Sequence, residues 1–220
     1  MTPNEPLVRW DWIFSRLPEI GQRLGEHIVL TVIAVGAGFV ISFLLSLVVR
    51  RFPGTYSPIT WVGGVLYTIP SLALFALLIP VTGLTLITAE IGLISYTLLI
   101  LTRNIVSGLQ SVPAEVRETA LGMGYTPAQM FWLVELPLAI PIILAGVRVA
   151  TVSTIGLVTV TALIGQGGLG YFILDGLVRF FSTPLILGAT LSIALAAVAD
   201  ALLVLLQRAV TPWAAATRGA

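Results

Sequence analysis

The chain has 220 residues, of which 57% are hydrophobic and 10% are charged, and its formal net charge is +1. Soluble domains carry about 25% charged residues, so this chain has more apolar surface than one soluble core can bury, and we place it in a lipid bilayer. The near-neutral charge leaves no basic face for nucleic acid, and the absence of cysteine excludes disulfide, thiol and zinc-thiolate chemistry.

The N-terminal segment 1–26 mixes acidic residues, arginine and tryptophan. It lacks the short basic start and following apolar run of a cleavable signal peptide. Trp10 and Trp12 are typical of the lipid headgroup level, where amphipathic aromatic rings gather. We therefore expect an interfacial amphipathic tail ahead of the first membrane span.

His27, the only histidine, lies at the edge of the first apolar segment. A single histidine at that position supports neither a metal site nor a serine–histidine dyad. An intramembrane protease, the alternative from the enzyme class, therefore lacks its general base. We expect an interfacial, structural role for His27.

Five long apolar segments follow, and a spanning helix needs about 20 mostly apolar residues. The sequence therefore predicts an all-α polytopic membrane protein with five transmembrane helices. Their expected positions are 28–49, 59–81, 85–109, 138–164 and 184–206. We expect these helices to form one transmembrane domain, 27–209, followed by a C-terminal tail, 210–220.

An odd number of spans places the two termini on opposite sides of the membrane, and arginine gathers on the cytoplasmic side. The side with more arginines holds Arg50, Arg51, Arg103, Arg117, Arg208 and Arg218. The opposite side holds Arg179 and, in the N-terminal tail, Arg9, Arg16 and Arg23. We therefore predict a multi-pass protein of the cell membrane with its N-terminus outside and its C-terminus in the cytoplasm.

Pro70 lies inside the second predicted span, where a proline removes one backbone hydrogen bond and kinks the helix. Neighbouring helices can satisfy the freed carbonyl. The kink serves either packing or gating. We take Tyr67, Pro70 and Ser71, with Asn104 in the next span, as pathway or gate candidates.

Residues 111–137 place charged side chains between two apolar blocks. A proline at a first helical turn, with Glu115 and Glu118 near the positive helix end, predicts a short amphipathic helix. Gly124 ends this helix by permitting a left-handed residue, and Thr126 caps a second short helix. The segment therefore predicts helix, glycine turn, helix across one membrane face. An ordinary amphipathic loop resting on the headgroups would have the same pattern.

This loop resembles the cytoplasmic coupling loop of type I ABC permeases, the membrane subunits of binding-protein-dependent importers. That pattern is Glu-Ala-Ala, three residues, Gly, nine residues, Ile, one residue, Leu-Pro. The matching positions here are Glu118, Thr119, Ala120, Gly124, Val134, Leu136 and Pro137. Only threonine for alanine and valine for isoleucine depart from it. The resemblance implies docking on a separate ATPase between the third and fourth spans, and Glu115 and Gly122 join these ATPase-coupling candidates.

The resemblance also implies cofactors and partners. ATP and magnesium would be bound by the partner ATPase subunits, and no cofactor by this chain, because a P-loop needs a lysine and the chain has none. One five-helix subunit offers half of a pathway, so we expect a second permease copy or a paralogue. An extracytoplasmic substrate-binding protein would deliver the substrate.

Four stretches, "YTIPSLALFALLIP", "LLILTRNIVSGL", "LAGVRVATVSTIG" and "ALIGQGGLGYFI", are similar to the permeases of osmoprotectant importers. The resemblance implies glycine betaine, choline, carnitine or a related quaternary ammonium compound as substrate. Tyr67, Trp61, Tyr96 and Phe75 offer cation–π faces to such an ion, although aromatic residues at such positions also serve as packing or interface anchors. Alternatives are a methionine-like amino-acid importer permease and a passive channel or structural membrane protein.

The stretch "GQGGLG" at 165–170 fits the spacing of a dinucleotide-binding turn, which requires a preceding strand. Here it follows an apolar span, so we interpret it as a pore entrance or re-entrant turn, where non-helical backbone is buried or lines a cavity. The candidate residues are Gly165, Gly167, Gly168 and Gly170.

Arg148 and Asp200 lie inside the fourth and fifth predicted spans. At about 1.5 Å per residue, both lie roughly 12–15 Å from the cytoplasmic ends of their helices. Intramembrane charges are costly and usually face a partner or a cavity. We therefore predict an intramembrane ion pair. In the alternative, Arg148 snorkels or lines the pathway and Asp200 bonds elsewhere.

Overall fold

The computed structural model describes residues 6–213, which form helices and connecting turns, as the predicted all-α class requires. The helices are α1 Trp10–Ser15, α2 Leu17–Arg51, α3 Tyr56–Thr68, α4 Ser71–Thr82, α5 Leu86–Gln110, α6 Ala114–Gly122, α7 Pro127–Met130, α8 Leu136–Val158, α9 Gly170–Arg179 and α10 Ser182–Val210. Short 3-10 turns occupy Pro53–Thr55 and Thr159–Ile164, and a π-helical turn occupies Phe131–Glu135.

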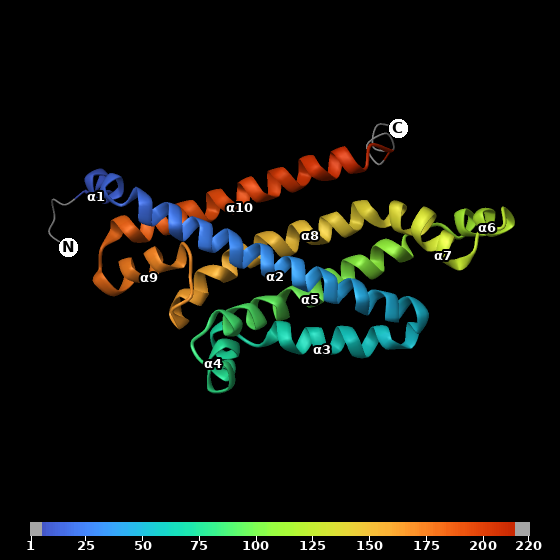
Figure 1. The fold of residues 1–220 in the computed structure, drawn as a ribbon, viewed down its shortest axis with the longest axis horizontal. Coiled ribbons are helices and arrows are strands. Elements are labelled where there is room, and N and C mark those ends of the chain that lie inside the picture. Colours follow the sequence, from blue (N-terminus) through green and yellow to red (C-terminus); the bar gives the residue numbers. More distant parts are fainter. Residues whose placement is uncertain (1–5, 214–220) are drawn as a thin grey trace.

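The four longest helices, α2, α5, α8 and α10, run along the long axis of the molecule (Figure 1). Each is long and apolar enough to cross a membrane, and the bent pair α3–α4 supplies a fifth crossing if its two halves are one span. α1 lies at one end of this axis, and the C-terminal end of α10 points toward the other (Figure 1). The C-terminal ends of α2, α5 and α10 point toward the end of the molecule at which α6 and α7 lie (Figure 1). Arg50 and Arg51 lie in the last turn of α2, and Arg208 lies in the last turn of α10.

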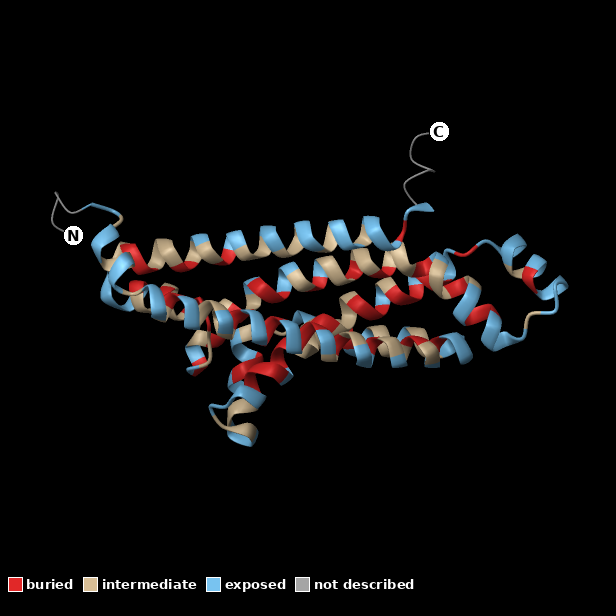
Figure 2. Cartoon of the chain, turned by 45° about the horizontal axis from the view of Figure 1, so that its top comes forward, coloured by how far each residue is buried: buried red, intermediate tan, exposed pale blue. Residues whose placement is uncertain are grey.

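Buried residues line the inner faces of the helices, whereas the outer face of α10 is exposed along much of its length (Figure 2). Phe75, Leu93 and Leu101 are fully buried between helices. Val32 and Leu205 are large apolar residues that face outward and are more than half exposed. An apolar outer surface is what a helix bundle presents to lipid rather than to water.

The second predicted span is not one helix. α3 ends at Thr68 and α4 begins at Ser71, and the two are bent by 97°. Ile69 has an extended backbone with a ψ of 126° because the proline ring that follows it disfavours helical geometry. We predicted a kink within one helix at Pro70. The structure instead has a break between two helices, because the residue before the proline is not helical.

The helix that leads into the fourth predicted span begins before residue 138. α7 passes through the π-helical turn directly into α8, so that 127–164 forms one continuous helical segment. Pro137 has no N–H to donate to the preceding turn, and a π-helical turn absorbs such a break without ending the helix. The second short helix of the loop, expected to be separate, is thus the first turn of this segment.

The first long helix also starts earlier than predicted, because α2 begins at Leu17 rather than near residue 28. Ile20 packs against Leu169 and Phe172, and Trp12 meets the ring of Phe172 edge-on at 6.2 Å between centroids. Hydropathy predicted only the start of the apolar run near residue 28. The more polar turns before it are also helical, and Ile20 in them packs against Phe172 of α9. Part of the expected N-terminal tail is therefore helical, and Trp12 and Ile20 pack beside Phe172.

The last predicted connection is largely helical as well. α9 forms where the sequence suggested a loop between the fourth and fifth spans, and α10 begins at Ser182. Residues 1–5 and 214–220, which include part of both expected tails, lie outside the described residues.

Candidate coupling loop and transport pathway

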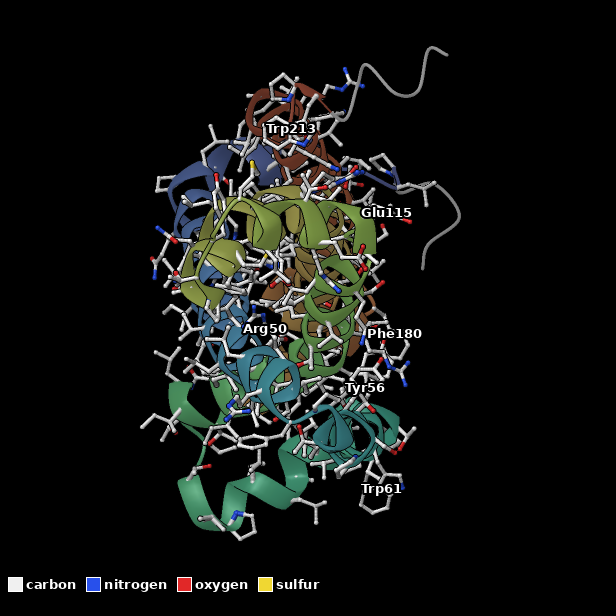
Figure 3. All side chains as sticks on the ribbon, turned by 90° about the vertical axis from the view of Figure 1, so that its right-hand side faces the viewer. Arg50, Tyr56, Trp61, Glu115, Phe180 and Trp213 are labelled. Atoms are coloured by element: carbon white, nitrogen blue, oxygen red, sulfur yellow. The ribbon has the colours of Figure 1, made fainter. Side chains whose placement is uncertain are left out.

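α6 stands at one end of the molecule, beyond the ends of the long helices (Figure 1). Its positions 115, 118, 119 and 122 recur at three- and four-residue intervals, so they lie on one face of the helix. The candidates Glu115, Glu118, Thr119 and Gly122 are all exposed, and Figure 3 shows Glu115 at the periphery of this end. Ala120 is buried instead. α6 therefore turns an acidic face outward and a small residue inward.

The turn after α6 follows the predicted stereochemistry. Gly124 has a φ of 85°, and its N–H donates to the carbonyl of Leu121 at 2.9 Å. Thr126 forms a capping box with Gln129, in which each side chain accepts from the other residue's backbone N–H. The remaining loop candidates, Leu136 and Pro137, lie in the first turn of α8, separated from α6 by the π-helical turn.

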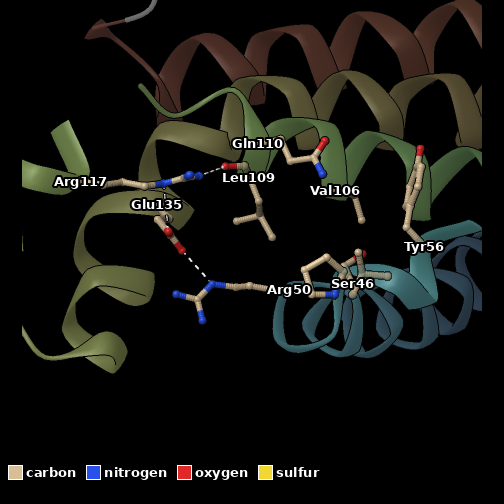
Figure 4. Close-up of a pocket in the computed structure, with 10 residues that line it drawn as sticks. Ser46, Arg50, Tyr56, Val106, Leu109, Gln110, Arg117 and Glu135 are labelled. Atoms are coloured by element: carbon tan, nitrogen blue, oxygen red, sulfur yellow. Dashed lines mark hydrogen bonds and ion pairs between the residues drawn. The ribbon is translucent and has the colours of Figure 1, made fainter. Parts of the chain in front are cut away.

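An ion-pair cluster that the sequence did not predict lies behind α6 (Figure 4). The carboxylate of Glu135 lies between Arg50, in the last turn of α2, and Arg117 of α6. The three side chains line a cavity of about 540 Å³ together with Tyr56 and Gln110. Arg50 and Glu135 are 85 residues apart in the sequence, so local spacing gave no signal that they meet.

The break between α3 and α4 borders a second cavity, of about 300 Å³. Among the predicted pathway residues, Tyr67, Pro70 and Ser71 line this cavity. The hydroxyl of Tyr96 donates to the carbonyl of Ile69, which replaces a helical bond lost at the break. The rings of Tyr67 and Tyr96 meet at 66° with centroids 5.9 Å apart. The cavity thus combines two aromatic rings with hydroxyl groups.

Asn104 is not part of that cavity. Its side chain donates to the carbonyl of Ile100 at 2.8 Å. A Cβ at Gly146 would lie 2.3 Å from the Asn104 Cβ, so the residue fills the crossing of α5 and α8. Asn104 therefore has a packing position, apart from the other predicted gate residues. Trp61 is 69% exposed and Phe75 is fully buried, so neither lines the cavity of Tyr67 and Tyr96.

His27 is fully buried between helices, which confirms the structural part of its predicted role. Its Nε2 lies 3.0 Å from the carbonyl oxygen of Ile155 in α8, and its Nδ1 accepts from the N–H of Leu169 at 3.3 Å. These contacts correspond to a neutral imidazole with its proton on Nε2. Because α2 begins at Leu17, His27 sits within the helix rather than at its edge, and it joins α2, α8 and the glycine-rich turn.

The glycine-rich turn 165–170 packs against neighbouring backbone. A Cβ at Gly167 would lie 2.9 Å from the Ala162 Cα, and one at Gly170 would lie 2.2 Å from the Thr159 carbonyl oxygen. Gly165 has a φ of 75° and open space around it, whereas Gly168 is pressed against His27. These contacts account for the glycines by packing and backbone geometry around the end of α8.

Arg148 and Asp200 come together in the structure. The Nε and Nη2 of Arg148 donate to the two carboxylate oxygens of Asp200 at 2.9 and 3.0 Å, in a bidentate geometry. The pair joins α8 to α10, with side chains 31% and 38% exposed, beside an open cavity of about 530 Å³. Each charge thus has its partner within the chain.

Residues 34–212 match the family model described as the binding-protein-dependent transport system inner membrane component. The chain belongs to this family. It is 37% identical over 194 residues to the choline transport system permease protein OpuBB of Bacillus subtilis, covering 88% of this chain and 89% of that protein. It is also 37% identical to the osmoprotectant import permease protein OsmW of Salmonella typhimurium, over 85% of this chain and 89% of that protein.

A solved structure shows the same fold. An inward-facing form of the MetNI methionine ABC transporter superposes with a TM-score of 0.76 over 86% of this chain and 94% of that chain, at 23% identity. A type I permease fold is therefore supported independently of close sequence similarity. The protein is an inner membrane component of a transport system, with several helices that are long and apolar enough to span the membrane.

Proposed function

We propose that this permease forms the translocation pathway of an ATP-driven importer for a quaternary ammonium osmoprotectant such as glycine betaine, choline or carnitine. The observation that carries the proposal is the similarity over most of the chain to a choline permease and to an osmoprotectant import permease. The likeness to the methionine transporter, at 23% identity, supports the fold alone. An amino-acid substrate therefore has weaker support.

In this proposal α6 is the coupling helix, and it docks on a separate ATPase subunit that binds ATP and magnesium. The exposed row Glu115, Glu118, Thr119 and Gly122 would face that subunit. Val116 and Leu121 are exposed on the same short helix, and Met123 is exposed directly after it, so this segment offers apolar contacts beside the acidic ones. A helix of nine residues that buries only Ala120 has most of its surface available for a partner.

The proposal includes an orientation in the membrane. Docking of α6 on a cytoplasmic ATPase would place the α6 end of the molecule in the cytoplasm, together with the C-terminal end of α10, and the N-terminal end of α2 outside. The substrate-binding protein would then act at the α1 and α9 end. A second permease copy or a paralogue would complete the pathway.

The cavity at the α3–α4 break is the proposed pathway site. Rings of tyrosine attract a quaternary ammonium group electrostatically, by about 2 kcal/mol when the site is desolvated. Tyr67 and Tyr96 supply such rings, and Ser71 supplies a hydroxyl for a polar substrate group. A cavity at a broken span also changes shape whenever α3 and α4 move relative to each other.

Uptake into proteoliposomes tests the function. The permease, its partner ATPase and the binding protein are reconstituted, and accumulation of labelled choline, glycine betaine, carnitine and methionine is measured with and without ATP. We expect ATP-dependent accumulation of a quaternary ammonium substrate. A partner ATPase with an inactivated site provides the control. Uptake that does not depend on ATP would instead indicate a passive channel, and accumulation of methionine alone would overturn the substrate proposal.

A further inference from the structure

The Glu135 cluster joins four helical elements at the α6 end (Figure 4). Glu135 lies in the π-helical turn before α8, and its side chain is only 9% exposed. One carboxylate oxygen accepts from Arg50 Nε of α2 at 2.8 Å. The other lies 3.2 Å from Arg117 Nε of α6. Arg117 also donates from Nη2 to the carbonyl of Leu109, at the end of α5, at 2.7 Å.

The two arms of the cluster differ in geometry. The Arg50 arm is a short hydrogen bond, and its guanidinium also lies over the ring of Phe131, with Cζ 4.9 Å from the centroid. The Arg117 arm has an ion-pair distance, but Arg117 Nε makes no hydrogen bond to Glu135 in the described structure. The Arg50 arm therefore fixes Glu135 to α2. Arg117 is fixed to the end of α5 by its bond to the Leu109 carbonyl, and its charge attracts Glu135.

α6 has few other attachments to the bundle. Ala120 is its only buried residue, and most of the helix is exposed (Figure 2). Arg117 faces the nearly buried carboxylate of Glu135 and also donates to the carbonyl of Leu109, so it connects α6 to the π-helical turn and to the end of α5. Arg117 therefore supplies the main polar link between α6 and the ends of α2, α5 and α8.

We propose that Glu135 is a positioning residue, which holds α6 through Arg117 so that a displacement of α6 moves the ends of α2, α5 and α8 together. This inference rests on the proposed role of α6 as the coupling helix. The link combines the hydrogen bond from Arg117 to the Leu109 carbonyl with the charge attraction between Arg117 and Glu135, and it resists separation of α6 from the bundle. Glu135 therefore acts within the permease, on α6. The proposed ATPase contacts lie on another face of α6.

The test compares the amount of substrate transported per ATP hydrolysed in the reconstituted complex. Arg117→Gln removes the α6 arm and leaves Glu135 paired with Arg50, so the chain retains its folded bundle. We expect this ratio to fall by about fivefold or more, the range of couplings between linked sites, while ATP hydrolysis continues. Glu135→Gln should lower the ratio as well, because it removes the charge attraction and leaves α6 held only by the bond from Arg117 to the Leu109 carbonyl. The double variant should lose less than the sum of the two single losses, because both substitutions remove the Arg117–Glu135 attraction.

Arg51→Gln is the matched control, because it removes an arginine next to Arg50 that lies outside the cluster and over the ring of Phe52. It should leave the ratio unchanged. If the cluster only stabilised the fold, its loss would lower assembly, ATP hydrolysis and transport together, and the amount of substrate transported per ATP hydrolysed would not change. That result would overturn the inference. If the wild type shows no ATP-driven uptake, the proposed function fails instead.

Amide hydrogen exchange of the purified chain tests the role of Arg117 without any partner protein. It therefore distinguishes a wrong inference about the cluster from a wrong proposed function. Exchange in 114–122 should be faster in Arg117→Gln and unchanged in Arg51→Gln. Equal protection of α6 in Arg117→Gln and in the wild type would show that Arg117 does not hold the helix, whatever the protein transports.

Discussion

Gly124 and Gly168 both adopt positive φ in turns between helices, but their surroundings differ. Gly124, between α6 and α7, has a φ of 85°, and a Cβ there would find no atom within 4 Å. Gly168, before α9, has a φ of 45°, and a Cβ there would lie 2.6 Å from the His27 Cβ and 2.8 Å from its Cα and N. The first position needs glycine for its backbone angle alone, and the second needs it also for space.

Gly124 therefore lies in a turn at the surface, whereas Gly168 lies in a turn that packs against another helix. A turn in open space sets the direction of α6 and α7 while the rest of the bundle is unaffected by it. The turn at Gly168 is part of the contact that joins α2 to the end of α8 through His27. Substitutions at the two glycines should therefore act on different properties, transport at one and folding at the other.

The largest effect is expected from Gly168→Val. The new side chain meets the backbone of His27 and requires a disfavoured φ, and the two costs together are about 2–5 kcal/mol. Thermal unfolding in detergent, followed by tryptophan fluorescence, should show a large loss of stability. Gly21→Ala, at an exposed helical glycine with open space around it, is the control. Wild-type stability of Gly168→Val would mean that the turn relaxes freely.

His27→Ala should have the next largest effect. It leaves the buried N–H of Leu169 without its acceptor, which costs about 1–3 kcal/mol. It should not rescue Gly168→Ala, because the new Cβ would still lie 2.8 Å from the Cα and N of residue 27. The double variant, measured by the same unfolding assay, should be less stable than either single variant. Rescue would show that only the imidazole side chain crowds the turn.

The sequence predicted the Gly124 turn and missed the Gly168 contact for the same physical reason. Caps, prolines and glycines act on residues within a few positions, so the end of α6 and the capping box at Thr126 could be predicted from spacing. The neighbour of Gly168 is His27, which is far away in the sequence, and no local pattern pairs them. The Glu135 cluster was missed for that reason too.

Helix starts were predicted less well than apolar runs. Hydropathy identified the apolar part of α2 but not its polar first turns, which begin at Leu17 and pack near α9. The start of the 127–164 segment was predicted from the Thr126 cap, but its continuation through a π-helical turn into α8 was not. The pairing of Arg148 with Asp200 could be predicted because two opposite charges in apolar helices have few alternative partners. The contacts of Asn104, by contrast, depend on a close approach at Gly146, which apolar composition does not reveal.

Gly124→Val should have a smaller effect on stability than the changes at the buried turn. A β-branched residue at this φ costs about 1–2 kcal/mol with no steric clash added. The chain should insert and the bundle should unfold nearly as in the wild type. Because α6 would be redirected, ATP-driven uptake should fall while the partner's hydrolysis continues. Uptake at the wild-type level would show that the direction of α6 does not depend on this turn.

Gly124→Asn should have the smallest effect of all. Asparagine visits the left-handed region more readily than other residues with a side chain, so its cost should be well below the ~1–2 kcal/mol expected for valine. Its side chain would enter open space at Gly124, whereas at Gly168 the same residue would meet the backbone of His27. We therefore expect Gly124→Asn to retain both stability and uptake, and Gly168→Asn to lose stability almost as Gly168→Val does. The unfolding and uptake assays on these two variants compare one substitution at two similar backbone angles. If both variants were equally stable, backbone angle alone would account for both glycines, and the crowding at His27 would contribute nothing.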